Sequence, residues 1–286
     1  MRGPQRPAFT LVEVVVVLAV GGVVAAAVAS VLLGNQRLYR SQEQVLETQR
    51  SVRAAAQLLA ADLRGADGGD GDIAALSDTA VTVKAARAFG VVCARPEPST
   101  RTLIISNSRL YGYRAIDPAR DSVLVFRDGD TLLASDDRWL RGPVAATGAA
   151  RCPDGSAATR VTLGGTAGES GQLDGVTSGS PVRVFEVVRY RLYDDGTRTW
   201  WLGVQSFNGA WSATSPLVGP LNPTNGVQFE FFDASGAPTV ERAAVRQVRI
   251  TVRGRSSQVI VAAGRRAGPY QDSISTRVYL RNSARP

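Results

Sequence analysis

The sequence contains no histidine, and among its 286 residues there are only two cysteines, Cys93 and Cys152. Histidine is the most common general base in enzymes, and the usual serine and cysteine triads and most catalytic zinc sites depend on it. Its absence therefore excludes the most widespread hydrolase and zinc-enzyme arrangements. The two cysteines also lack the Cys-x-x-Cys spacing that a redox or metal-binding motif requires.

Other catalytic signatures are missing as well. The glycine-rich stretch 164–168 lacks the Lys-Ser/Thr ending of a phosphate-binding loop, and no serine lies in a nucleophile-elbow motif. Paired acids can act together, as they do in glycosidases. Here Asp136-Asp137 and Asp194-Asp195 lie in turn-like settings, and turn chemistry accounts for them without catalysis. We therefore expect no enzymatic activity, no cofactor and no metal.

Lysine is almost absent, because Lys84 is the one exception among basic residues that are otherwise all arginine, and the net charge is +8. In the segment 248–253 aliphatic residues alternate with polar ones, two of them arginines, which predicts a strand with one buried and one solvated face. Nucleic-acid binding would be one use of such a face. No aromatic-basic recognition motif accompanies it, so we expect an ordinary solvated strand face and no nucleic-acid partner.

A long apolar segment, residues 9–33, contains a single charged residue, Glu13. As a helix it would be roughly 37 Å long, which exceeds the ~30 Å of hydrocarbon in a bilayer. Arg2 and Arg6 precede it, so the positive-inside rule predicts a single crossing with a cytoplasmic N-terminus. An acid within a membrane segment costs on the order of 3 kcal/mol, which makes Glu13 a candidate functional residue.

A secretory signal peptide is the alternative interpretation of this segment, because Ala27-Val28-Ala29 is similar to a signal-peptidase site. The apolar run is longer than an ordinary signal core of about 7–15 residues, and Glu13 lies inside it. Both observations favour a retained membrane helix.

The helical pattern continues over residues 34–64, where an apolar stripe at seven-residue spacing predicts an amphipathic helix docked on one globular surface. Leu38, Val45, Val52 and Leu59 form the stripe, and Ala56 and Leu63 lie on the same face. The glycine-rich segment 65–72 should end this helix. Its spaced aspartates lack the EF-hand spacing, so they predict a flexible polar loop and not a calcium site.

The remainder, residues 72–286, shows short apolar runs separated by turn signals, which predicts strands. The Asp194-Asp195-Gly196 and Asp128-Gly129-Asp130 segments are typical hairpin turns. We expect an α+β fold in which one long N-terminal helix is followed by a mostly antiparallel β head. The predicted strands are 80–84, 90–94, 102–106, 122–127, 131–134, 160–163, 182–193, 197–205, 226–232, 245–252 and 275–280.

The segment Ala8-Phe9-Thr10-Leu11-Val12-Glu13 resembles the N-terminus of type IV prepilins and pseudopilins, whose motif has Gly before Phe-Thr-Leu-x-Glu. Ala8 stands where that family usually has Gly. The resemblance implies a leader peptide of residues 1–8, cleavage between Ala8 and Phe9 by prepilin peptidase, and N-methylation of Phe9. It also implies that Glu13 meets the N-terminal amine of a neighbouring subunit during assembly. Gly21-Gly22 would serve either close helix packing or local unwinding in a filament.

Later segments resemble minor pseudopilins and minor pilins of the GspJ and PilW type. They are residues 57–64, 219–233, 245–252 and 278–282. Residues 76–180 carry no such resemblance. The resemblance implies a structural subunit, anchored in the inner membrane with a periplasmic head, that primes or tips a type IV pilus or type II secretion pseudopilus. Its partners would be other minor subunits and the major subunit. The alternatives are a single-pass anchored periplasmic binding protein or adhesin, and a periplasmic hydrolase released by signal cleavage.

Export would place Cys93 and Cys152 in an oxidising compartment that permits a disulfide. Closing their 59-residue separation would stabilise the fold by roughly 4 kcal/mol in the chain-entropy treatment. Two buried free thiols are the alternative.

Overall fold

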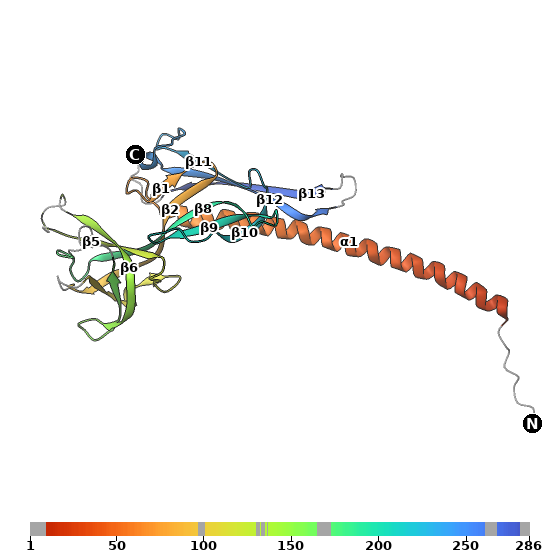
Figure 1. The fold of residues 1–286 in the computed structure, drawn as a ribbon, viewed down its shortest axis with the longest axis horizontal. Helices are drawn as coiled ribbons and strands as arrows, with labels where there is room; N and C mark the ends of the chain where they lie inside the picture. The colour runs from red at the N-terminus through yellow and green to blue at the C-terminus, as the bar shows by residue number, and fades with distance from the viewer. Residues whose placement is uncertain are drawn as a thin grey trace, which may run out of the picture.

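The computed structural model describes residues 10–96, 101–129, 132, 135, 137–164, 173–260 and 268–280. A single long helix, α1 (Leu11–Arg64), projects from a head made of antiparallel strands. The N-terminal end of this helix lies far from the head, which is gathered around its C-terminal part (Figure 1). The predicted fold class, a long apolar N-terminal helix followed by a mostly antiparallel β head, is thereby confirmed.

Helix α1 has 54 residues and is therefore about 81 Å long. Thr10 is its N-cap and accepts a hydrogen bond from the Glu13 N–H, and Gly65 follows its last residue, Arg64. The buried face of the helix begins only at Thr48, and Leu38 at the start of the predicted stripe is 56% exposed. Among the described residues, the polar contacts of the head with the helix begin at Gln44.

The strands follow in the order β1 (Ile73–Leu76), β2 (Ala80–Ala94), β3 (Thr102–Ser106), β4 (Tyr111–Gly112), β5 (Asp121–Arg127), β6 (Arg138–Arg151), β7 (Ala157–Leu163), β8 (Pro181–Asp194), β9 (Trp200–Phe207), β10 (Ser215–Leu221), β11 (Val227–Phe232), β12 (Gln247–Ile260) and β13 (Gly268–Tyr279). Two short 3₁₀ turns, Asn107–Arg109 and Arg242–Ala244, interrupt them. The Asp194-Asp195-Gly196 turn joins β8 to β9 as a hairpin.

One part of the head is a sheet that packs on α1. It runs from β1 through the first half of β2, the second half of β8, β9 and β10 to β12, which also pairs with β11 and β13. Helix α1 lies mainly across β12, β13 and β10. Val52, Leu59 and Leu63 of the helix are fully buried against the sheet. In β12 the aliphatic residues Val248, Ile250 and Val252 also enter this core, as the alternating pattern predicts.

The other part is a closed barrel. The second half of β2 and the first half of β8 leave the sheet and remain paired with each other, and four further strands close a ring between them. Each neighbouring pair around the ring is antiparallel: β2–β3, β3–β7, β7–β6, β6–β5, β5–β8 and β8–β2. Its interior is a second core that includes Leu103, Ile105, Val123 and Val161. The barrel forms a lobe beyond the C-terminal end of the helix (Figure 1).

The strand predictions differ from the structure in several places. The two runs 80–84 and 90–94 are one continuous strand, β2, which serves both the sheet and the barrel. The short strands β1 and β4 and the longer strands β6 and β10 were not expected. Most side chains of β6 are exposed, and neither β6 nor β10 has an apolar alternation. The predicted strand 131–134 falls largely outside the described residues, and Leu132 within it lies in a turn.

Candidate assembly interface

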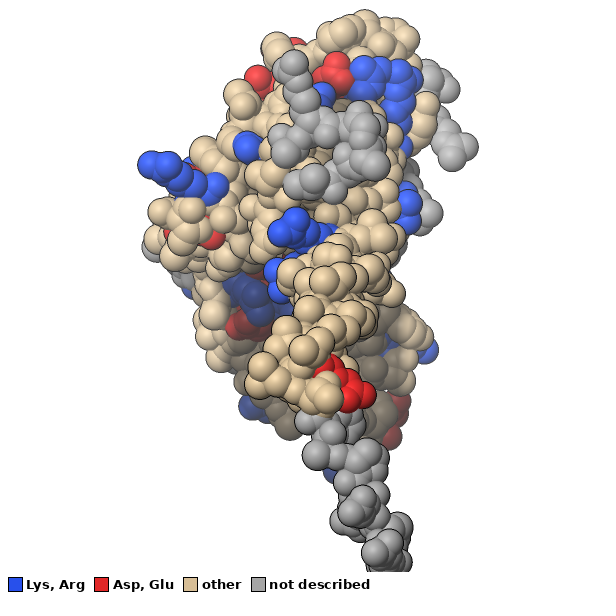
Figure 2. Space-filling model, turned by 90° about the vertical axis from the view of Figure 1, so that its right-hand side faces the viewer, with Lys and Arg blue, Asp and Glu red and all other residues tan. Residues whose placement is uncertain are grey.

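The N-terminal half of α1 is an apolar rod without a partner among the described residues of the head. Its most apolar 18-residue window has a mean hydropathy of 2.7 and is not buried at all. By length and composition this helix can cross a membrane. Figure 2 looks along the helix and shows a largely uncharged surface on the part that projects from the head. The apolar side chains here need a bilayer or neighbouring helices to remove them from water.

Glu13 lies in the first turn of this rod, and it is the one charged residue between Thr10 and Gln36. Its backbone N–H donates to Thr10 Oγ1 at 3.3 Å, which fixes the start of the helix. Its carboxylate is exposed and forms no ion pair within the part of the chain that the structure describes. An acid near a helix N-terminus is favoured by the helix dipole, but in hydrocarbon it still needs a cationic partner. Ala8 and Phe9, the predicted cleavage and methylation residues, lie outside the described residues.

A buried ionic network, which we call the junction network, connects the helix to both parts of the head. Arg87 of β2 donates through Nη1 to the two carboxylate oxygens of Asp62, at 2.9 Å and 3.1 Å. Its Nε donates to Glu186 Oε2 of β8 at 2.8 Å. Tyr190 also donates its hydroxyl to Asp62. The last turns of α1 are therefore tied to the pair of strands that runs from the sheet into the barrel.

The network continues into the barrel through Arg114. This residue forms a bidentate pair with the fully buried Asp121, at 2.7 Å and 2.6 Å, and also reaches Glu186 at 3.2 Å. Burial alone would lower the pKa of the Arg87 guanidinium, but the charge and hydrogen bonds of Asp62 outweigh burial and raise it. Burial, followed by the negative charge of Asp62, raises the pKa of Tyr190. Both residues therefore keep their protonated forms at neutral pH, and the network can hold the barrel in one orientation.

Nothing in the sequence pattern pointed to this network. Arg87 is 25 residues from Asp62 and 99 from Glu186, and spacing alone cannot bring such positions together. The sequence offered one hint of this network, Asp62. A carboxylate two residues before the end of an amphipathic helix lies where it can contact the head.

Cys93 and Cys152 are joined by a disulfide. Cys93 lies near the end of β2, and Cys152 follows directly on β6. The bond therefore connects two strands that are not neighbours in the barrel, and Cys152 is buried.

The loop after α1 is polar, as expected, but two of its acids, Asp67 and Asp72, are buried and hydrogen-bonded. Asp72 is 1% exposed, and it accepts hydrogen bonds from Arg183 Nη1 at 2.8 Å and from the backbone N–H of Asp67. The prediction of a flexible loop therefore fails for these residues, because an arginine from a distant strand pairs with Asp72. Among the described residues, no group of three or more His, Cys, Asp or Glu side chains could hold a metal ion.

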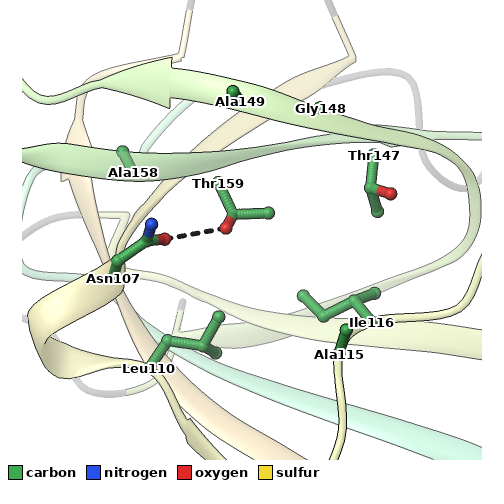
Figure 3. Close-up of a pocket in the computed structure, with 9 residues that line it drawn as sticks. All are labelled: Asn107, Leu110, Ala115, Ile116, Thr147, Gly148, Ala149, Ala158 and Thr159. Carbon is green, nitrogen blue, oxygen red and sulfur yellow. Dashed lines mark hydrogen bonds between the residues drawn. The ribbon is translucent and has the colours of Figure 1, made fainter.

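A hollow of about 440 Å³ opens on the barrel between β6, β7 and the segment 107–116. Figure 3 shows Thr159 donating to Asn107 Oδ1 at 2.7 Å on one side, with Leu110 and Ile116 facing them. None of its nine lining residues is charged. The described residues that line the hollow can offer apolar contact and a few hydroxyls, and none of them is an acid, a base or an ionic ligand.

Comparison with known proteins identifies one motif, at the N-terminus of the chain. Residues 5–29 match the prokaryotic N-terminal methylation motif. No curated protein and no solved structure matches the chain. The motif indicates a type IV pilin-like protein processed as a prepilin, and the apolar helix that it opens fits that description. It implies processing by prepilin peptidase and assembly with other pilins, and it marks a structural class and not an enzyme class. The single N-terminal apolar helix suggests membrane anchoring.

Proposed function

We propose that this chain is a minor pilin or pseudopilin, which joins other minor subunits in the complex that primes or caps a type IV pilus or a type II secretion pseudopilus. The observation that carries the proposal is Glu13, an acid in the first turn of a membrane-length helix that has no ionic partner among the described residues. A carboxylate in hydrocarbon is costly unless it is paired. A neighbouring subunit's N-terminal ammonium would supply that pair.

The place of the barrel supports a minor role. It lies at the end of the molecule opposite the N-terminus, beyond the C-terminal end of α1 (Figure 1). In a filament whose helices are bundled, a lobe in that position would occupy the space of the next head along the axis. A subunit at the tip has no such neighbour. The barrel is therefore compatible with a capping position, and it would obstruct the repeated position of a major subunit.

Processing, topology and partners follow from the same proposal. Prepilin peptidase would remove residues 1–8 and methylate Phe9, residues 9–33 would lie in the inner membrane, and residues 34–64 would continue the helix into the periplasm. The head, residues 72–286, would be periplasmic and would contact the other minor subunits and the major subunit.

The test is the substitution Glu13→Ala. It removes the charge without touching the head, so export, folding and membrane attachment should remain as in the wild type. Recovery with the other minor subunits and in sheared filaments should fall strongly, because the ammonium of the neighbour loses its partner. Glu43→Ala is the matched control, since Glu43 is an exposed acid on the same helix outside the apolar segment.

Equal recovery of the Glu13→Ala and Glu43→Ala variants would reject the assembly role. The chain would then be better described as a single-pass anchored periplasmic binding protein or adhesin, a function for which the barrel and its hollows offer surfaces.

A further inference from the structure

A second cleft lies where the loop after α1 meets the outer face of the barrel. Its volume is about 570 Å³. One wall is formed by the loop residues Asp70 and Asp72, and the other by side chains of β2, β5, β6 and β8. The cleft is separate from the apolar rod and from Glu13, and the proposed assembly function makes no use of it.

The barrel wall of the cleft is a row of side chains in register across four strands. In the strand register, Arg141 of β6 lies opposite Leu124 of β5, Leu124 opposite Arg183 of β8, and Arg183 opposite Phe89 of β2. All four point outward, because their strand neighbours Val123, Val125, Val182 and Val184 are in the barrel core. Trp139, two residues before Arg141, extends the same face and is held edge-on against Phe126 at 5.5 Å between ring centroids. The wall thus alternates cationic and apolar side chains.

The floor of the cleft is ionic and incompletely paired. Arg183 is 9% exposed and donates to Asp72 at 2.8 Å, and Lys84 Nζ lies 3.7 Å from the other oxygen of Asp72. Arg183 Nε and Asp72 Oδ1 are buried without a hydrogen-bond partner among the described residues. Buried polar groups are nearly always hydrogen-bonded, so the ionic groups beneath the cleft are only partly satisfied by the described residues.

The charges in the cleft leave a positive excess. Among the described residues that line the cleft, Lys84, Arg141 and Arg183 face two carboxylates, Asp70 and Asp72. Burial lowers the pKa of Lys84, and the neighbouring Arg141 and Arg183 lower it further against the opposing effect of Asp72. An anion placed between Lys84 and Arg141 would relieve this repulsion.

We propose that this cleft binds a carboxylate that has an apolar or aromatic side chain close beside it. Lys84 and Arg141 pair with the carboxylate, and the apolar part lies against Leu124, Phe89 and Trp139. A single net positive charge suits a monoanion, whereas a phosphate dianion would leave a negative charge against Asp72. Both a free aromatic acid and the C-terminal residue of a peptide have this chemistry.

Lys84 makes the test direct, because it is the only lysine in the chain. The full-length protein in detergent is treated with an amine-reactive acetyl ester, and acetylation of Lys84 is followed by mass spectrometry of its peptide. N-acetyl-L-phenylalanine is the probe. At ten times its Kd it should slow acetylation by about tenfold, since only the unoccupied protein reacts. The neutral amide of the same compound should give no protection.

Two substitutions on β6 form a matched pair. Arg141→Gln should abolish most of the protection, whereas Arg138→Gln, an arginine on the same strand that does not line the cleft, should leave it unchanged. Removal of Arg141 also raises the pKa of Lys84 and slows its basal reaction, so the measured quantity is the ratio of rates with and without probe. Arg141 is exposed, so neither variant should unfold the head.

A peptide ending in phenylalanine with a free carboxylate distinguishes the two sources. If it protects more strongly than N-acetyl-L-phenylalanine at equal concentration, the ligand is a chain terminus; if it does not protect while the small acid does, the ligand is a small molecule. Both results support the cleft. Equal protection by the amide or by inorganic phosphate, or no protection by either carboxylate, would overturn the proposal.

Discussion

Val52 of α1 and Gly254 of β12 lie so close together that a Cβ on the glycine would be 2.5 Å from Val52 Cγ2. The same added atom would be 2.8 Å from Thr48 Cγ2, one helical turn earlier. The helix therefore meets the sheet at a place where the strand has no side chain. This contact marks the start of the buried face of α1 and sets how closely the helix approaches the head.

Replacement of Gly254 by Ala should lower the free energy of unfolding by about 1–3 kcal/mol, because an overpacked core must shift the helix or the strand. Urea denaturation followed by tryptophan fluorescence measures this change, since all four tryptophans are in the head. Gly148→Ala is the control: an added Cβ there has nothing within 4 Å. A Gly254→Ala variant as stable as the control would show that the helix does not rest on this position.

The Cys93–Cys152 bond should be present in exported protein. Alkylation of the unreduced, denatured chain should therefore label no thiol, and two labelled thiols would contradict the structure. Replacing both cysteines by Ala should lower the free energy of unfolding by roughly 4 kcal/mol, because the bond closes a separation of 59 residues.

Acid should weaken the junction network through Glu186. Burial alone would raise the pKa of Glu186, but hydrogen bonds from Ser206 and Arg87 and the charge of Arg87 lower it. Because its folded-state pKa is lowered, Glu186 contributes fully to the free energy of unfolding at pH values above its unfolded-state pKa of about 4.3. That contribution is lost as the pH falls through the lowered pKa. The free energy of unfolding should therefore decrease as the pH falls below about 5.

The variant Glu186→Gln should be less stable at pH 7 by about 3 kcal/mol, because buried guanidinium groups lose a partner. Its stability should also depend less steeply on pH between about 5 and 2 than that of the wild type. Glu230→Gln is the control, since Glu230 is 55% exposed in its pair with Arg249 and should matter little. Parallel pH curves for the wild type and Glu186→Gln would exclude Glu186 as the titrating group.

Prepilin peptidase should cut the precursor between Ala8 and Phe9 and methylate the new N-terminus. Incubation with the peptidase and mass measurement of the product test this directly. The variant Ala8→Gly should be cut faster, because it restores the residue that the prepilin motif usually has at this position. A mass that stays unchanged for both forms would reject the assignment of the leader.

The outline of the fold could be predicted because it depends on local patterns. The apolar run from Leu11, the uninterrupted helix to Arg64 and the turn at Asp194-Asp195-Gly196 each follow from neighbouring residues. The part of the helix that docks on the head could not be predicted. The seven-residue apolar stripe begins at Leu38, but it does not show where the head starts to cover the helix. β6 escaped prediction because its alanines, glycines and arginines have no alternation, and pairing with β5 and β7 makes it a strand.

By itself, the sequence determined the apolar rod, the position of Glu13 within it and the antiparallel β character of the head, since hydrophobic spacing and turn residues act over a few positions. Only the tertiary structure decided that β2 and β8 run from the sheet into a closed barrel, since ring closure depends on pairing between residues as far apart as Gly90 and Val182. The junction network and the cleft at Lys84 arise in the same way. Their charged residues come from segments far apart in the sequence, which no local pattern connects. Because these charges are buried, each one needs the others as partners.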